Sequence, residues 1–342
     1  MSTYLMHRDF VAVKTWLLVC LALVVCMVAV GGYTRLSGSG LSITQWKLVH
    51  GAIPPMDEQE WQEEFSAYQA TPQYKKVNQG MSLDAFKTIY WPEYAHRLLG
   101  RLIGIVFLLP LVFFWLRKSI TPRFAGRLAL IFALGGLQGL VGWIMVASGL
   151  VDRPYVHPVK LALHLGLAFA LFSFLVWAFL DISRNGPLIA ITSKTRHWFR
   201  LWSIVLFVQI LVGALVAGSH AGLIYNSWPD MGGAWIPADI VDSSVVLVQF
   251  IHRKLALFVV ISYGFWWCLH RQYVKNNHLG KWCAGLTLLI GTQFILGVWT
   301  LLGGATGVVP LHLAWTHQMI ALGLLAVSVM LLHRLSWHKV EG

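Results

Sequence analysis

Charged residues are scarce in this sequence of 342 residues, because Asp, Glu, Lys and Arg together make up only 12%. Soluble domains carry about 25%, so the composition excludes an ordinary soluble domain. It also excludes a disordered chain, since 57% of the residues are hydrophobic and Trp alone occurs 17 times. Disordered chains are poor in such residues.

Cysteine is scarce as well, and the four cysteines lie within or at the ends of apolar runs: Cys20, Cys26, Cys268 and Cys283. None stands in a long loop, so we predict neither a structural disulfide nor a zinc site. A cleavable signal is not evident. The first apolar run, which starts near Thr15, is too long for the core of a signal peptide.

Long apolar runs are what the sequence has in abundance. A helix needs roughly 20 apolar residues to cross a bilayer, and eight runs reach this length. They are Val13–Gly32, Tyr94–Leu116, Ala125–Ala147, Lys160–Leu180, Arg200–Ser219, Ser244–His270, Trp282–Leu302 and Leu311–His333. The last two are separated by the glycine-rich segment 303–307 and by Pro310. We therefore predict an all-α integral membrane protein with eight transmembrane helices.

The basic residues indicate the orientation of these spans. They gather at both termini and in the loops after the second, fourth and sixth spans: Arg8, Lys14, Arg117, Lys118, Arg123, Arg127, Arg184, Lys194, Arg196, Arg200, Arg271, Lys275, Lys281, Arg334 and Lys339. Cytoplasmic loops are enriched in Lys and Arg, so both termini are predicted to be cytoplasmic. The net charge of +12 then reflects membrane topology, and we expect no nucleic-acid partner.

The first outer loop, residues 33–91, is long and rich in aromatics. Trp61, Phe65 and Tyr68 recur in it at helical spacing and are flanked by glutamates. This pattern predicts an amphipathic helix on the outer surface. The alternative is a solvated linker.

The sequence contains an internal repeat. Gly31 and Trp46 recur 182 residues later as Gly213 and Trp228, and other pairs recur at offsets between 153 and 156. Those pairs are His96 with His252, Arg97 with Arg253, Gln138 with Gln293, Gly142 with Gly297, and His164 with His317. The repeat predicts two pseudo-symmetric four-helix bundles, residues 1–185 and 186–342.

Four of the 14 histidines lie at matched depth near the outer ends of alternate spans: His96, His164, His252 and His317. Neutral imidazole is the usual axial ligand of haem iron, whereas zinc requires a tighter cluster. We predict two haem sites, His96 with His164 and His252 with His317. Hydrogen bonding between helices is the alternative, and nearby His312 competes with His317.

An arginine follows the first histidine of each pair. Arg97 and Arg253 are suited to binding the two carboxylates of a haem. They are equally suited to reaching the outer lipid headgroups, and the sequence alone does not decide between these roles.

One position differs between the halves in a way that bears on chemistry. Glu93 precedes His96 by three residues, whereas Gln249 precedes His252 by the same spacing. Such spacing places both side chains on one face of a helix. A carboxylate there can relay protons or stabilise a developing cation, so we expect the reaction in the first half. The alternative is that Glu93, just after Pro92, only complements a helix N-terminus.

These motifs resemble the haem A synthase family, in particular its long proteobacterial and mitochondrial form. The resemblance is carried by GYTRLSGSGLSITQWK at 32–47, EYAHR at 93–97, KLALH at 160–164, AGSHAGLIYN at 217–226, His252-Arg253 and His317-Gln318. It covers nearly the whole chain. Two features differ from the family pattern: the cysteine pair that some members have in the first outer loop is missing, and WPDM stands at 228–231 where FPLM is expected.

The resemblance implies an oxidoreductase that converts the C8 methyl of haem O to a formyl group by successive hydroxylations, giving haem A for cytochrome oxidase. It assigns Glu93, His96 and His164 to the substrate site and His252 and His317 to a haem b cofactor. A bacterial inner membrane, periplasmic-side sites, haem O synthase and oxidase assembly factors as partners follow from it. The electron donor and homo-oligomerisation are left open.

Two other classes compete with this interpretation. A dihaem b cytochrome exchanging electrons with quinone explains the four histidines equally well, but it does not explain the difference between Glu93 and Gln249. A transporter built from repeats uses intramembrane histidines as proton relays. Its spans are typically broken near the midplane, whereas here the histidines lie near the outer face.

Overall fold

The computed structural model describes residues 9–46, 50–183, 192–276 and 279–336. Several residues discussed above lie outside these ranges. They are Arg8, Lys47, Arg184 and Lys339.

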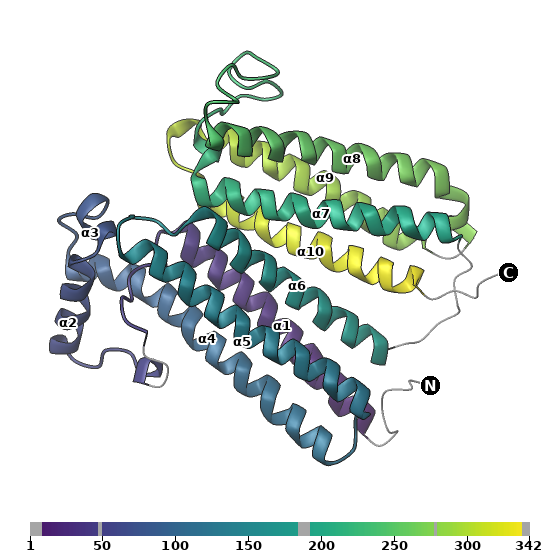
Figure 1. The fold of residues 1–342 in the computed structure, drawn as a ribbon, viewed down its shortest axis with the longest axis horizontal. Helices are drawn as coiled ribbons and strands as arrows, with labels where there is room; N and C mark the ends of the chain where they lie inside the picture. The colour runs from purple at the N-terminus through teal and green to yellow at the C-terminus, as the bar shows by residue number, and fades with distance from the viewer. Residues whose placement is uncertain (1–8, 47–49, 184–191, 277–278, 337–342) are drawn as a thin grey trace. The chain divides into compact units, whose positions relative to one another are not determined.

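Eight helices in the described part of the chain are long and apolar enough to cross a membrane, which confirms the predicted all-α membrane class (Figure 1). They are α1 (Phe10–Leu36), α4 (Leu83–Leu116), α5 (Pro122–Leu150), α6 (Pro158–Ile182), α7 (Ser193–Ser219), α8 (Ser244–Asn276), α9 (Gly280–Gly303) and α10 (Leu311–Leu335). Short 3-10 turns, η2 (His50–Ala52), η3 (Ala221–Leu223) and η4 (Gly304–Thr306), stand in the connections.

The chain divides into two compact units, a first of residues 6–171 and a second formed mainly by residues 172–342. The division falls within α6. The domain boundary at residue 185 stays a prediction.

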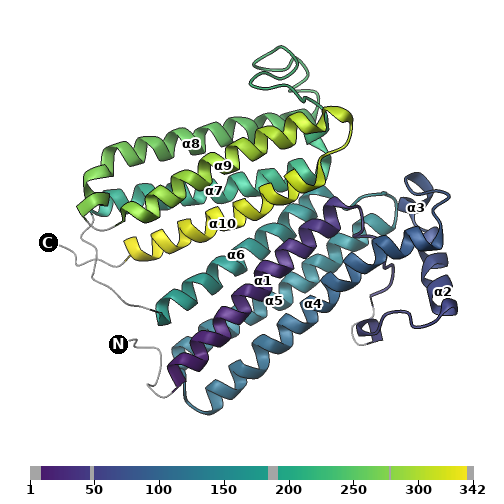
Figure 2. The same ribbon diagram turned by 180° about the vertical axis from the view of Figure 1, so that it is seen from behind.

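In the first unit, α1 lies along α4 (Figure 2). The buried indole of Trp16 donates to the backbone oxygen of Val106 over 2.9 Å and packs between Phe107 and Phe114. In the second unit, Trp202 of α7 donates to the backbone oxygen of Val259 in α8 over 3.0 Å. Burying an indole with its N–H satisfied combines a large apolar contact with no unpaired donor, so each tryptophan fixes a helix pair.

The first outer loop is shorter than predicted, because helix continues at both ends. α1 extends to Leu36, and α4 begins at Leu83 instead of Tyr94. The side chain of Ser82 accepts a hydrogen bond from the N–H of Ala85, which is a favourable helix start. Pro92 lies inside α4. Its backbone oxygen accepts a hydrogen bond from the Thr34 hydroxyl over 3.1 Å.

Two short helices fill the loop, α2 (Glu58–Gln69) and α3 (Pro72–Lys76). The predicted amphipathic helix is confirmed as α2, and its apolar stripe of Trp61, Phe65 and Tyr68 is buried. The stripe packs on Phe86, Tyr90 and Tyr94 of α4. The aromatic spacing is therefore explained by contact with the first turns of α4, the helix that also carries Glu93.

Candidate active site

Each histidine of the two pairs packs against a glycine on the neighbouring helix. A Cβ added at Gly31 would lie 2.7 Å from Cε1 of His96, and one at Gly142 would lie 2.8 Å from Cε1 of His164. In the second unit, the corresponding distances are 3.0 Å from Gly213 to His252 and 3.0 Å from Gly297 to His317. Glycine lets the helix backbone approach closely, so the four recurring glycines make room for the four imidazoles.

Glutamines support three of these histidines. The amide nitrogen of Gln138 lies 3.1 Å from Nδ1 and 3.0 Å from the backbone oxygen of His164. That of Gln293 lies 3.1 Å from Nε2 of His317. In the second unit, Gln209 also donates to the backbone oxygen of His252 over 3.0 Å. The Gln138 amide also lies 3.3 Å from Nε2 of His164. Gln138 and Gln293 therefore orient the rings of His164 and His317, whereas Gln209 contacts only the backbone of His252.

Neutral imidazoles suit a haem iron. Nδ1 of His96, His252 and His317 is buried without a hydrogen-bond partner, and it faces the neighbouring glycine: an added Cβ would lie 3.1 Å from it at Gly31 and 3.6 Å from it at Gly213 and Gly297. The ring nitrogen farther from the glycine, Nε2, is therefore the one open to an iron at His96 and His252. His312 is exposed, so the geometry favours His317 over its rival.

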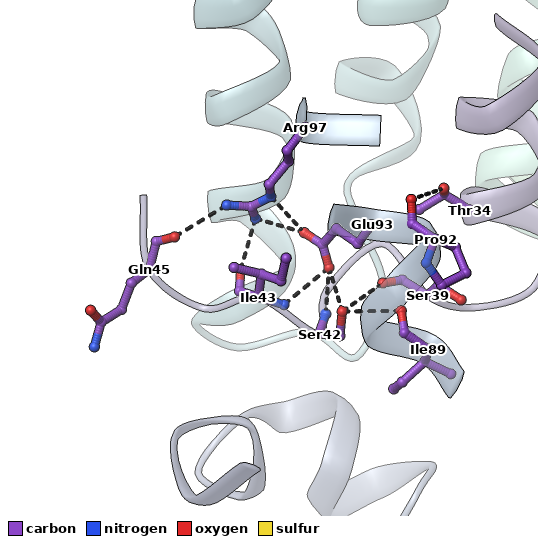
Figure 3. Close-up of polar contacts among 9 residues, drawn as sticks. All are labelled: Thr34, Ser39, Ser42, Ile43, Gln45, Ile89, Pro92, Glu93 and Arg97. Atoms are coloured by element: carbon purple, nitrogen blue, oxygen red, sulfur yellow. Dashed lines mark hydrogen bonds and ion pairs between the residues drawn. The ribbon is translucent and has the colours of Figure 1, made fainter. Parts of the chain in front are cut away.

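Glu93 accepts five hydrogen bonds (Figure 3). It is 3% exposed. Its Oε2 accepts from the backbone N–H of Ser42 (2.7 Å), the hydroxyl of Ser42 (2.7 Å) and the N–H of Ile43 (3.0 Å). Its Oε1 accepts from Nη2 (2.6 Å) and Nε (3.1 Å) of Arg97. Glu93 therefore ties the segment after α1 to α4, and it lies inside the helix instead of at its N-terminus.

Arg97 completes this arrangement. Its guanidinium also donates to the backbone oxygens of Ile43 (2.8 Å) and Gln45 (3.1 Å), as Figure 3 shows. The same group lies 5.3 Å from the centre of the Trp46 ring. Planar guanidinium suits bidentate and stacking contacts at once.

In the second unit, the arginine makes similar backbone and tryptophan contacts, but an amide stands in place of the carboxylate. Arg253 donates to the backbone oxygens of Ser227 (2.8 Å) and Asp230 (2.5 Å) and lies 5.2 Å from the centre of the Trp228 ring. Its Nη1 is buried without a partner. Gln249, the counterpart of Glu93, donates to the backbone oxygen of Tyr225 over 3.0 Å.

A second substitution accompanies that change. Ser42, which supplies two donors to Glu93, has Ile224 as its counterpart at the repeat offset of 182. Loss of the carboxylate and loss of its hydroxyl donor therefore occur together. At this position the first unit carries a carboxylate, ion-paired with Arg97 over 2.6 Å, where the second unit carries an amide.

A cavity of about 330 Å³ reaches this charge network. It lies in the first unit, and its lining includes Tyr90, Tyr94, Arg97 and Arg101 of α4 together with Glu60, Glu63 and Glu64 of α2. A polar cavity of this size holds several water molecules, so the Arg97 side of the network has an aqueous neighbour.

Sequence reasoning missed several residues. No local sequence pattern marks Ser42, Gln209 or the contacts of Trp46. His333, which the sequence places without distinction near a helix end, is buried in the second unit and lies 2.9 Å from Oδ1 of Asp181. That pair links α10 to the last turn of α6.

The fold and the site together define a helical, multi-pass membrane protein with an internal repeat and a partly buried histidine pair in each repeat. A family model described as cytochrome oxidase assembly protein (COX15-CtaA) matches residues 14–329. The chain belongs to this family.

Its relatives carry one name. A protein of Parvibaculum lavamentivorans named "Heme A synthase" is 44% identical over 95% of this chain and 94% of its own length. Proteins with the same name from Methylobacterium radiotolerans (46% identical; 93% of this chain, 88% of the relative) and Nitrosospira multiformis (42%; 94% and 93%) are similar in extent.

Proposed function

We propose that this chain is a haem A synthase, an oxidoreductase that converts the C8 methyl of haem O to a formyl group through two successive hydroxylations. The observation that carries the assignment of the reaction to the first unit is the buried Glu93 with its five donors. Gln249 in the second unit has no negative charge to offer.

In this proposal His96 and His164 hold the substrate haem O, and His252 and His317 hold a resident haem b. Bound haem supplies redox chemistry at its iron. The support is the common geometry of the four histidines: a glycine contact for each imidazole and a glutamine beside His164 and His317. His96 and His164 would hold haem O, and its iron would supply the redox chemistry at this site.

Glu93 acts as a fixed negative charge beside the substrate. An ionised carboxylate is an acceptor-only group, and all five contacts of Glu93 come from donors. A protonated acid would have to present its own hydrogen to one of those donors. The network therefore favours electrostatic stabilisation of positive charge that develops at the oxidised methyl over a proton relay through this residue.

The two arginines differ in the N–H donors that remain to bind a haem carboxylate. Arg253 retains a buried, unpartnered Nη1, which fits a carboxylate of haem b. Arg97 uses most of its donors on Glu93 and the 43–45 backbone. We assign Arg253 to cofactor binding and Arg97 first to holding Glu93, with its remaining Nη1 hydrogen available to the substrate.

The same proposal includes the orientation of the chain in the membrane and its cellular location. Both termini are placed in the cytoplasm of a bacterium, the chain in its inner membrane, and the histidine pairs toward the periplasmic side. The positive residues near the opposite helix ends support this orientation. Haem O synthase is the natural donor of the substrate. The electron donor is not assigned.

Single histidine replacements test the two sites separately. The variants His164→Ala and His317→Ala are purified from cells that make haem O, and the haems are extracted and identified by mass. We expect His164→Ala to lose haem O and its oxidised products but retain haem b, and His317→Ala to lose haem b. His312→Ala is the matched control and retains both. Loss of haem b from His312→Ala but not from His317→Ala would overturn the ligand assignment.

A further inference from the structure

Gly139 of α5 and Phe294 of α9 occupy equivalent positions in the two repeats. Gln138 and Gly142 recur as Gln293 and Gly297 with the same spacing, so no gap separates the two alignments. Each position directly follows the glutamine that contacts a paired histidine. Glycine has no side chain, whereas phenylalanine has one of the largest.

In the second unit, Phe294 fills space between α9 and the loop after α7. Its ring packs edge-on against Trp228, with centroids 5.5 Å apart and an interplanar angle of 79°. Trp228 in turn lies 5.2 Å from the guanidinium of Arg253. Four residues before Phe294, Ile290 is also buried, with 5% of its surface exposed.

The first unit retains the tryptophan and arginine but lacks this filling. Trp46, the counterpart of Trp228, lies 5.3 Å from Arg97 and is 44% exposed. A Cβ added at Gly139 would find no heavy atom within 4 Å. The same holds at Gly135, the counterpart of Ile290. At two positions on one face of the helix that carries Gln138, the first unit therefore has glycine where the second unit has a large apolar side chain.

We infer that Gly139 is a specificity-determining position, whose missing side chain leaves room for the isoprenoid chain of haem O. The inference rests on the proposed function, in which the first unit takes haem O and the second takes haem b. Haem O differs from haem b by this long apolar substituent. An apolar chain gains free energy by leaving water for an apolar surface, whereas Phe294 excludes it from the second site by occupying the space.

The test is a size series at one position. Wild type, Gly139→Ala, Gly139→Leu and Gly139→Phe are purified from cells that make haem O, and haem b and haem O-derived pigments are quantified per chain. A side chain added where a ligand packs forces atoms apart and weakens binding. We expect Gly139→Phe to hold haem b at the wild-type level and haem O and its products at about a tenth of that level or less. Gly139→Leu should lie between.

Gly126→Phe is the matched control, because Gly126 lies on the same helix with equally open space but near the opposite end. It retains both pigments. Wild-type amounts of haem O-derived pigment in Gly139→Phe would overturn the inference alone. A parallel loss of both pigments across the Gly139 series would overturn it too, because it would indicate a structural role. A wild-type protein with haem b only would instead overturn the proposed function.

Discussion

Ser42 and Glu93 are joined by two hydrogen bonds to a single oxygen, one from the hydroxyl and one from the backbone N–H of Ser42, each over 2.7 Å. They lie 51 residues apart in the chain. Ser42, in the segment after α1, holds the carboxylate from one side, while Arg97 holds it from within α4. Because Ile224 and Gln249 stand at the equivalent positions, the two repeats have diverged as a coupled pair.

Replacement of Glu93 by Gln should stop product formation without emptying the site. The amide keeps the size of the carboxylate but removes its charge, and its NH₂ group opposes the donors of Ser42 or Arg97. We expect haem A to fall by about 100-fold, in line with the removal of one electrostatic stabiliser, while haem O or its hydroxylated intermediate stays bound. Extracted pigments are measured by mass. Asp84→Asn, which removes an exposed carboxylate at the start of the same helix, is the control and should leave haem A formation in place. Normal haem A from Glu93→Gln would exclude a role for the charge.

The glycines beside the histidines should resist alanine. In an ordinary helix interior, Gly→Ala stabilises by about 1 kcal/mol. At Gly213 the new Cβ would lie 3.0 Å from Cε1 of His252, so we expect Gly213→Ala to reduce bound haem b instead. Gly31→Ala should reduce only haem O-derived pigment. The control Gly104→Ala, where no atom lies within 4 Å, should change neither. Unchanged haem content in both variants would show that the glycine contacts do not shape the sites.

Gln293 should tune the second site from outside. Replacement by Leu removes the amide 3.1 Å from His317 but leaves both proposed ligands. We expect haem b to remain bound with an altered reduction potential, since outer contacts set ligand orientation and basicity. Redox titration followed by absorbance measures this. Gln138→Leu should leave that potential unchanged. An identical midpoint in Gln293→Leu would contradict the positioning role.

Replacement of each arginine by lysine should have a different effect on the bound haems. Lysine offers a point charge without a planar fork. Arg253→Lys is expected to weaken haem b retention, because Arg253 contributes both the loop contacts and the spare buried donor. Arg97→Lys is expected to spare haem b and lower haem A formation. Pigment ratios distinguish the two results, and equal loss of both pigments in both variants would contradict the division of roles.

The second outer loop should become less ordered in acid. A hydrogen bond of 2.5 Å from the Ser227 hydroxyl, together with the Gly233 N–H, lowers the pKa of Asp230. A lowered folded-state pKa stabilises the fold above the unfolded value of about 3.9, and the stabilisation disappears as the pH falls through the folded value. We therefore expect Asp230→Asn to increase proteolysis of the loop at pH 7. By contrast, the variant and wild type should converge once the pH falls below the folded-state pKa of Asp230. A difference that persists there would exclude this ionisation.

The sequence predicts the spans well, because long apolar runs are a strong signal. It places Trp61, Phe65 and Tyr68 on one helix face for the same reason. It does not predict the extension of α4 to Leu83, since the segment before Tyr94 is amphipathic and is explained by contact with α2. Patterns along the chain report periodicity, not distant partners. The contacts of Glu93 with Ser42 and of Asp181 with His333 therefore emerge only from the fold.

The central claim is that the two repeats hold different haems. It is tested by purifying the wild-type chain from cells that make haem O, extracting its pigment with acidified solvent and identifying the haems by mass. We predict haem b together with haem O, haem A or the hydroxylated intermediate. Haem b alone, at two per chain despite available haem O, would contradict the account and indicate a dihaem cytochrome.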